Sequence, residues 1–242
     1  MQARSHALLG AAAWLAAAPG VAGSAGAGPL GPRELLLGAV VTAGAALLPD
    51  LDHPRATVAR TLGPVTAAVA RVVGRMAGGH RGATHSLAAV ALTWLGVTAL
   101  LSGPAPRPAA ALVVFLCTAL AVRAAGPQQA RGGAALVAVA AVPAAAVGVA
   151  ALAGVGTGGG VGDVVRGGAA ALGWLPPAVA AGVLLHVLAD LLTPGGVPLL
   201  WPLAGRQRLA LTRTGGRVEA VIALAALGIT VWLGGAQLLR LG

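Results

Sequence analysis

The sequence predicts an all-α fold: a multi-spanning transmembrane helical bundle of about 6–7 spans, built as one domain over residues 1–242. Of the 242 residues, 57% are hydrophobic and only 9% are charged, and the mean hydropathy is +0.88. Soluble globular proteins do not have this composition. Several apolar runs approach or exceed the length of roughly 20 residues that crosses a bilayer as a helix. Short loops that carry arginine separate these runs, as in most membrane proteins.

The first two apolar runs occupy positions 7–21 and 35–48. Two interpretations stay open for residues 1–28, which form either a first membrane helix with His6 at its cytoplasmic end or a cleaved signal peptide. The second run is short for a span. It therefore predicts a helix that is tilted, re-entrant or extended at its start by residues 31–34.

Residues 55–79 form a different kind of segment, in which arginines alternate with apolar residues. The apolar positions recur every three or four residues, which is the pattern of one helix face. Gly63-Pro64 is expected to divide this segment in two. A basic amphipathic helix beside membrane spans is typical of the interface, with its apolar face in the lipid boundary and its arginines near anionic head groups.

The later apolar runs lie at about 87–101, 108–125, 133–153, 167–192 and 218–239. Either Thr84 or Ser86 is expected to cap the helix that starts at position 87. Proline at positions 143, 176 and 177 should kink or shorten two of the other helices. The Gly-rich link 154–168 is expected to be flexible.

The distribution of arginine predicts the orientation in the inner (plasma) membrane. With seven crossings, and with the 55–81 and 206–217 loops placed in the cytoplasm, twelve of the 16 basic residues face inward. Only Arg33, Arg107, Arg166 and Arg240 then face outward. This asymmetry predicts an N-terminus inside and a C-terminus outside, if the first run stays attached.

The net charge of +10 does not indicate nucleic-acid binding in this chain. The arginines belong to the membrane topology, and aromatic residues for base stacking are scarce, with five Trp, one Phe and no Tyr. The lone Cys117 lies in an apolar run and cannot form an intrachain disulfide.

Under the predicted topology, the unusual polar residues gather at one membrane face. They are His6, Asp50, Asp52, His53, His80, His85, His186 and Asp190. The prolines at positions 49 and 54 favour a turn in which the two neighbouring acids converge. Carboxylates at the mouth of an apolar segment are costly unless they are neutralised, and a divalent cation would neutralise them. The alternative is a solvated loop whose acids pair with Arg55 and Arg60.

His186 and Asp190 are four residues apart, so on a helix both side chains share one face. Both can then bind one cation or hold each other beside it. The alternative is a structural His–Asp hydrogen bond between packed helices. His80 and His85 suit a loop that runs into a helix, and a loop with two histidines is weak evidence when taken alone.

Imidazole and carboxylate are the ligands of zinc, and also of manganese and iron sites. Eight donors exceed one tetrahedral site and suit two divalent metals, which activate water and hold the oxygens of an in-line displacement at phosphorus. We expect His6, Asp52, His80, His85, His186 and Asp190 to bind metal, with zinc the first choice. Asp50 or His53 is expected either to act as the base or to support a metal ligand from behind, and Arg81 is expected to meet substrate charge. Glu219 is a weaker candidate that pairs equally well with Arg213 or Arg217.

At these residues the chain resembles the bacterial YdjM-like, inner-membrane metal-dependent hydrolases. The resemblance rests on His6 and on residues 48–54, 80–86, 186–202 and 214–219, and it says least about residues 102–168. It implies a membrane-embedded helical fold that is distantly similar to zinc-dependent phospholipase C and single-strand nucleases. It also implies a hydrolase, without defining the substrate.

The expected function is a membrane-bound, metal-dependent hydrolase that attacks a phosphoester with metal-activated water at the cytoplasmic membrane face. Membrane lipid is its expected partner, and the substrate is a small-molecule or lipid phosphoester. The alternative is a non-enzymatic multi-pass membrane protein, either a metal-binding structural protein or a transporter. A transporter would place polar residues through the middle of the bilayer, and this sequence has few there.

Overall fold

The computed structural model describes residues 1–24, 30–126 and 172–241, and α-helices form most of this part of the chain. Across the described ranges, the isolated bridge between Val197 and Gln207 is the single β pairing. The all-α prediction is therefore confirmed. The predicted run at 133–153 and the Gly-rich link at 154–168 lie outside the described residues.

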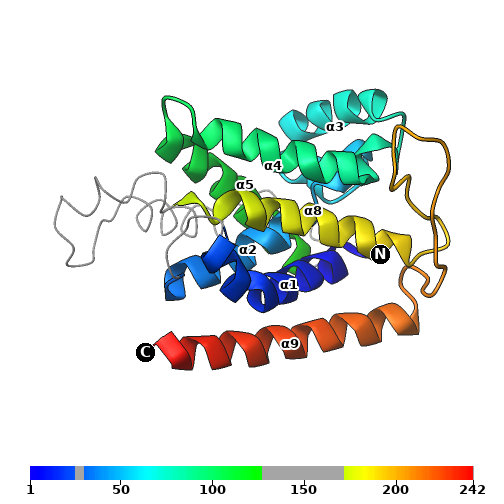
Figure 1. The fold of residues 1–242 in the computed structure, drawn as a ribbon. Helices are drawn as coiled ribbons and strands as arrows, with labels where there is room; N and C mark the ends of the chain where they lie inside the picture. Colours follow the sequence, from blue (N-terminus) through cyan, green and yellow to red (C-terminus); the bar gives the residue numbers. More distant parts are fainter. Residues whose placement is uncertain (25–29, 127–171, 242) are drawn as a thin grey trace.

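Six of the helices run side by side, and the seventh described helix lies at the edge of the bundle (Figure 1). The six are α1 (Ala3–Ser24), α2 (Pro32–Ala45), α4 (Leu87–Leu101), α5 (Pro106–Ala125), α8 (Leu175–Leu191) and α9 (Arg217–Leu241). The edge helix is α3 (Pro64–Met76). Segments Glu34–Asp52, Pro106–Ala125 and Arg217–Arg240 are long and apolar enough to cross a membrane.

Proline and serine set several helix boundaries as the sequence predicts. α3 begins at Pro64, which confirms the predicted break, and Pro176 and Pro177 lie in the first turn of α8. Proline fits the first turn because its missing N–H has no partner there in any case, so these prolines shorten α8 and leave it unkinked. Ser86, not Thr84, caps α4, since its Oγ accepts the backbone N–H of Ala89 at 3.2 Å.

Small residues let the central helices approach closely. A Cβ added to Gly10 of α1 would lie 2.7 Å from the carbonyl oxygen of Thr42 in α2. A Cβ added to Gly182 of α8 would lie 2.5 Å from the same oxygen. α2 is thus packed between α1 and α8, as in membrane proteins whose helices meet through small side chains.

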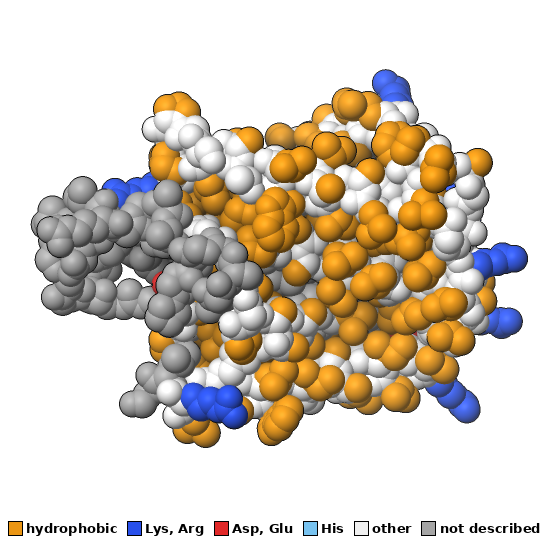
Figure 2. Space-filling view, viewed as in Figure 1, with side chains coloured by type: hydrophobic (Ala, Val, Ile, Leu, Met, Phe, Trp, Pro, Cys, Tyr) orange, Lys and Arg blue, Asp and Glu red, His pale blue; other side chains and the backbone are white. Residues whose placement is uncertain are grey.

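Apolar side chains cover the visible flank of the bundle, and arginines project mainly from its two ends (Figure 2). α9 exposes Leu224, Val231 and Trp232, each by more than two thirds of its surface. A flank of this kind suits lipid contact. The starts of α1, α4 and α9 and the ends of α2 and α8 share one end of the bundle, and the C-terminus lies at the other (Figure 1).

Candidate metal centre

The acidic loop after α2 is a short 3-10 helix, η1 (Pro49–Asp52), which fits the predicted turn. Gly74 of α3 packs against this loop, where an added Cβ would lie 2.7 Å from the carbonyl oxygen of Asp52. After α3 the chain reverses at Gly78 and Gly79, which have φ of 77° and 99°, values that favour glycine. This reversal brings residues 80–85 back to η1.

Four donor atoms form a compact cage at the centre of the cluster. The Nε2 atoms of His85 and His186 lie 3.1 Å apart. Asp50 Oδ1 lies 3.8 Å from the first and 3.7 Å from the second, and Asp190 Oδ2 lies at the same two distances. Donors in a regular tetrahedron around zinc are separated by about 3.3–3.4 Å. Each of these five separations lies within about half an ångström of that value, and Asp50, His85 and His186 are close enough together to hold one metal ion.

Hydrogen bonds aim the two central imidazoles inward. His186 Nδ1 lies 2.7 Å from the backbone oxygen of Ala46, and His85 Nδ1 lies 3.0 Å from Thr84 Oγ1 and 3.3 Å from Asp52 Oδ2. We assign the ring proton to Nδ1 in both residues, because acceptors lie there. The two Nε2 lone pairs then face each other, an arrangement that a cation stabilises.

Asp52 lies beside the cage and holds its parts together. Its Oδ2 accepts hydrogen bonds from the backbone N–H of Arg81 at 2.9 Å and from Thr84 Oγ1 at 2.5 Å, and its Oδ1 lies 2.9 Å from His80 Nδ1. Asp52 is buried among these partners. The alternative of a solvated loop whose acids pair with arginines does not describe this contact set.

The two carboxylates of η1 also set the protonation of His85. Burial alone would lower the pKa of its imidazole, but the hydrogen bonds and negative charges of Asp50 and Asp52 outweigh burial and raise that pKa. The metal-free centre therefore retains a proton on His85 more readily than a free histidine would.

His6 extends the cluster from α1. Its Nε2 lies 3.5 Å from Asp190 Oδ1, and its ring stacks on that of His186 with centroids 3.9 Å apart. The amino group of Met1 lies 2.8 Å from the same Asp190 oxygen. His6 Nδ1 is buried and has no hydrogen-bond partner among the described residues. A buried nitrogen without a partner carries a desolvation cost.

Arg81 reaches the centre through the other oxygen of Asp190. Its Nη2 lies 2.8 Å from Asp190 Oδ2, and its Nη1 donates to Thr193 Oγ1 at 2.8 Å. The same threonine hydroxyl donates to the Asp190 backbone oxygen at 2.8 Å. Arg81 thus lies beside the cage with its charge balanced by one of the four donors.

His53 and His80 lie at the open edge of the cluster, with ring centroids 4.6 Å apart and nearly perpendicular planes. The structure thereby brings together the eight donors that the sequence singled out, and all of them except His53 fall in three groups that could hold a metal ion. These groups are His6–His186–Asp190, Asp50–His85–His186 and Asp52–His80–His85. The donor types and the cage size fit a divalent metal.

Three contributing groups were not predicted from the sequence. Thr84 was considered only as a helix cap, Thr193 was not singled out, and the Ala46 carbonyl has no sequence signal because every residue has one. Glu219 lies apart from the cage. It accepts hydrogen bonds from the backbone N–H groups of Gln2 and Gly215 and from the Ser5 hydroxyl, and so ties α9 to α1.

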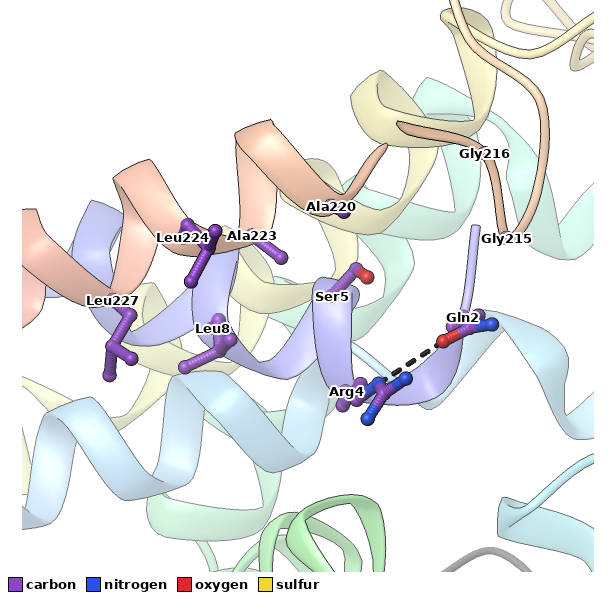
Figure 3. Close-up of a pocket in the computed structure, with 10 residues that line it drawn as sticks. All are labelled: Gln2, Arg4, Ser5, Leu8, Gly215, Gly216, Ala220, Ala223, Leu224 and Leu227. Atoms are coloured by element: carbon purple, nitrogen blue, oxygen red, sulfur yellow. Dashed lines mark hydrogen bonds between the residues drawn. The ribbon is translucent and has the colours of Figure 1, made fainter. Parts of the chain in front are cut away.

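A cavity of about 380 Å³ lies between α1 and α9 (Figure 3). Arg4 and Gln2, joined by a 3.1 Å hydrogen bond, lie at one end, and Leu8, Leu224 and Leu227 line the rest. None of the cage donors lines it, so it is separate from the metal centre.

Comparisons with known proteins agree with a membrane protein of this type. A family model described as "YdjM inner membrane protein" matches residues 1–240. The inner membrane proteins YdjM of Escherichia coli (strain K12) and of Shigella flexneri are each 44% identical over 68 residues. That match is 25% of this chain, and it spans only 35% of the length of these curated relatives. No solved structure matches the chain significantly.

Proposed function

Because the chain belongs to the YdjM inner membrane protein family, we propose that it is a membrane-bound, metal-dependent hydrolase that cleaves a phosphoester. The family description and the names of the relatives establish an inner membrane protein and state no reaction. The observation that carries the proposal is the four-atom cage of His85, His186, Asp50 and Asp190. We propose zinc as its metal, because two imidazoles and two carboxylates suit that ion.

The four residues of the cage hold the metal in this proposal, and His6, His80 and Asp52 surround them. A divalent metal held by three of these residues, with water in the fourth position, would supply Lewis acidity and a nucleophile at neutral pH. Asp50 therefore acts as a ligand. Asp52 acts as the carboxylate that orients His85 and His80. The sequence predicted Asp52, and not Asp50, as a metal ligand. The geometry favours Asp50 as the ligand, because Asp50 points into the cage and Asp52 points at ring nitrogens.

Proton transfer falls to the histidines at the open edge. His80 Nδ1 faces Asp52, so its Nε2 is left to take or give a proton at the mouth of the site. His53 packs against the His80 ring and is the second residue that can do so. Arg81 already lies at the cage, so its remaining N–H groups are placed to hold a phosphoryl oxygen of the substrate.

Metal analysis of the purified protein, followed by hydrolysis of a phosphoester panel, tests the proposal. We expect about one zinc ion per chain and hydrolysis that chelator abolishes and zinc restores. Asp190→Asn keeps the side-chain shape and removes the charge, so it should lower metal content and hydrolysis together while the protein still inserts.

Glu34→Gln is the matched control, since Glu34 lies in the first turn of α2, at the other end of that helix from η1. It should change neither metal content nor hydrolysis. If the Asp190 variant keeps its metal and the unmodified protein cleaves no phosphoester, the non-enzymatic alternative is correct.

A further inference from the structure

α3 separates two cavities that both reach the candidate metal centre. The first, of about 420 Å³, is lined by Asp52 and His80 of the centre and by Arg55, Arg71 and Arg75. All three arginines are exposed, and no carboxylate among the described residues forms an ion pair with them. This arginine cavity therefore offers unneutralised positive charge next to the metal centre, which suits a phosphate group.

The second cavity, also of about 420 Å³, lies between α3 and α4 and is largely apolar. Val73 and Met76 of α3, Leu92 of α4 and Trp201 line it. Thr84 also lines it, and the Thr84 hydroxyl donates to Asp52 beside the cage. This apolar groove therefore ends at the same centre as the arginine cavity.

The edges of the apolar groove face outward. Met76 is 82% exposed and Leu92 is 65% exposed, and α3 continues this surface through Val65 and Val72. Figure 1 shows α3 alongside α4 at the edge of the bundle. Exposed apolar side chains of this size are costly in water and favourable against lipid chains. The groove thus suits lipid chains, whereas the arginine cavity is charged and suits the aqueous side.

We propose that the substrate is a membrane lipid whose head group ends in a phosphate monoester. Its chains lie in the groove between α3 and α4, and its phosphate dianion is held between the cage and Arg55, Arg71 and Arg75. This inference rests on the proposed hydrolysis and names its substrate class. The oxygen of water bonds to phosphorus, the bond from phosphorus to the lipid oxygen breaks, and a proton from that water goes to the lipid oxygen. The products are a lipid alcohol, which remains in the bilayer, and inorganic phosphate, which leaves through the arginine cavity.

Binding of phosphatidic acid to the full-length protein in phosphatidylcholine nanodiscs tests the proposal without requiring turnover. Arg71→Gln combined with Arg75→Gln should weaken binding about tenfold or more, because two charge-assisted contacts are lost. The variant should keep its metal content, which shows that the centre still folds. Arg60→Gln is the matched control, since Arg60 is exposed on the same segment and does not line the cavity.

The groove is tested separately by Ala89→Trp, which fills it, with Leu95→Trp on the exposed surface of α4 as the control. Only the first should weaken binding of phosphatidic acid, and neither should change binding of soluble glycerol 3-phosphate. If glycerol 3-phosphate binds to the unmodified protein as tightly as phosphatidic acid, the site recognises the phosphate group without the lipid chains, and the lipid inference is wrong.

The same measurements separate this inference from the proposed function. If the arginine variants bind phosphatidic acid normally while the unmodified protein hydrolyses soluble phosphoesters, the lipid assignment fails and the hydrolase stands. If binding depends on the arginines and the groove while no phosphoester is cleaved, the lipid site stands and the hydrolase fails.

Discussion

His85 connects the two halves of the centre, because it contacts both acids of η1 and faces His186 across the cage. A protonated imidazole cannot bind a metal, and the pKa of His85 is raised, so protons and metal compete for it. We expect zinc affinity to fall as the pH drops below that raised pKa, and zinc binding near neutral pH to release protons. Calorimetric titration in buffers of different ionisation enthalpy measures both effects, and affinity that does not change with pH would contradict them.

Asp50 and Asp52 are only two positions apart, yet we expect them to have different roles. Asp50→Asn removes a cage donor and should abolish tight metal binding, whereas Asp52→Asn removes only the partner that orients His85 and His80. Loss of such a supporting partner typically weakens metal affinity by about 10–100-fold. Zinc titration against a chelating indicator gives the comparison. Equal losses in the two variants would show that the roles are not divided in this way.

Among the helices, α2 is the element whose position depends most on glycine. Gly182→Ala would force a methyl group to within 2.5 Å of the Thr42 oxygen and should separate α8 from α2. Overpacking of this kind costs about 1–3 kcal/mol, and it should also weaken metal binding because α8 carries His186 and Asp190. Thermal unfolding in detergent, with and without zinc, measures both.

Gly228→Ala in α9 is the control, since an added Cβ there meets nothing within 4 Å. The substitution should be neutral or stabilise the protein by up to about 1 kcal/mol, because alanine favours a helix. If the Gly182 variant unfolds no earlier than this control, close packing at Thr42 does not hold the bundle together.

The elements and the composition of the centre could be predicted because they follow from local patterns. Apolar runs and prolines gave the helices, and the spacing of His186 and Asp190 gave a shared face. The assignment of each acid could not be predicted, because a 3-10 turn between two prolines directs Asp50 and Asp52 to different sides of one imidazole. The two cavities beside α3 depend on how far apart α3 and α4 lie, and no local pattern specifies that distance.

On the scale of the whole molecule, the orientation in the membrane stays a prediction from the arginine distribution. A reporter fused after residue 215 should respond as cytoplasmic, and one fused after residue 242 should respond as external. The loop between α4 and α5 lies at the end of the bundle away from the centre, so a reporter inserted after Gly103 should also be external (Figure 1). The reverse pattern would place the metal centre on the other side.

The donors of the cage come from parts of the chain that are synthesised at different times. The ribosome makes His6, the η1 acids and His85 early, and these residues must wait for α8 to supply His186 and Asp190. Contacts of such long range form late, after the intervening chain has been inserted. Until then His80 and His85 can pair with the two acids of η1, whereas His6 and Arg81 lack their partner Asp190. The proposed metal can therefore bind to all four cage residues only after α8 has packed against α2, so we expect metal content to report completion of the bundle.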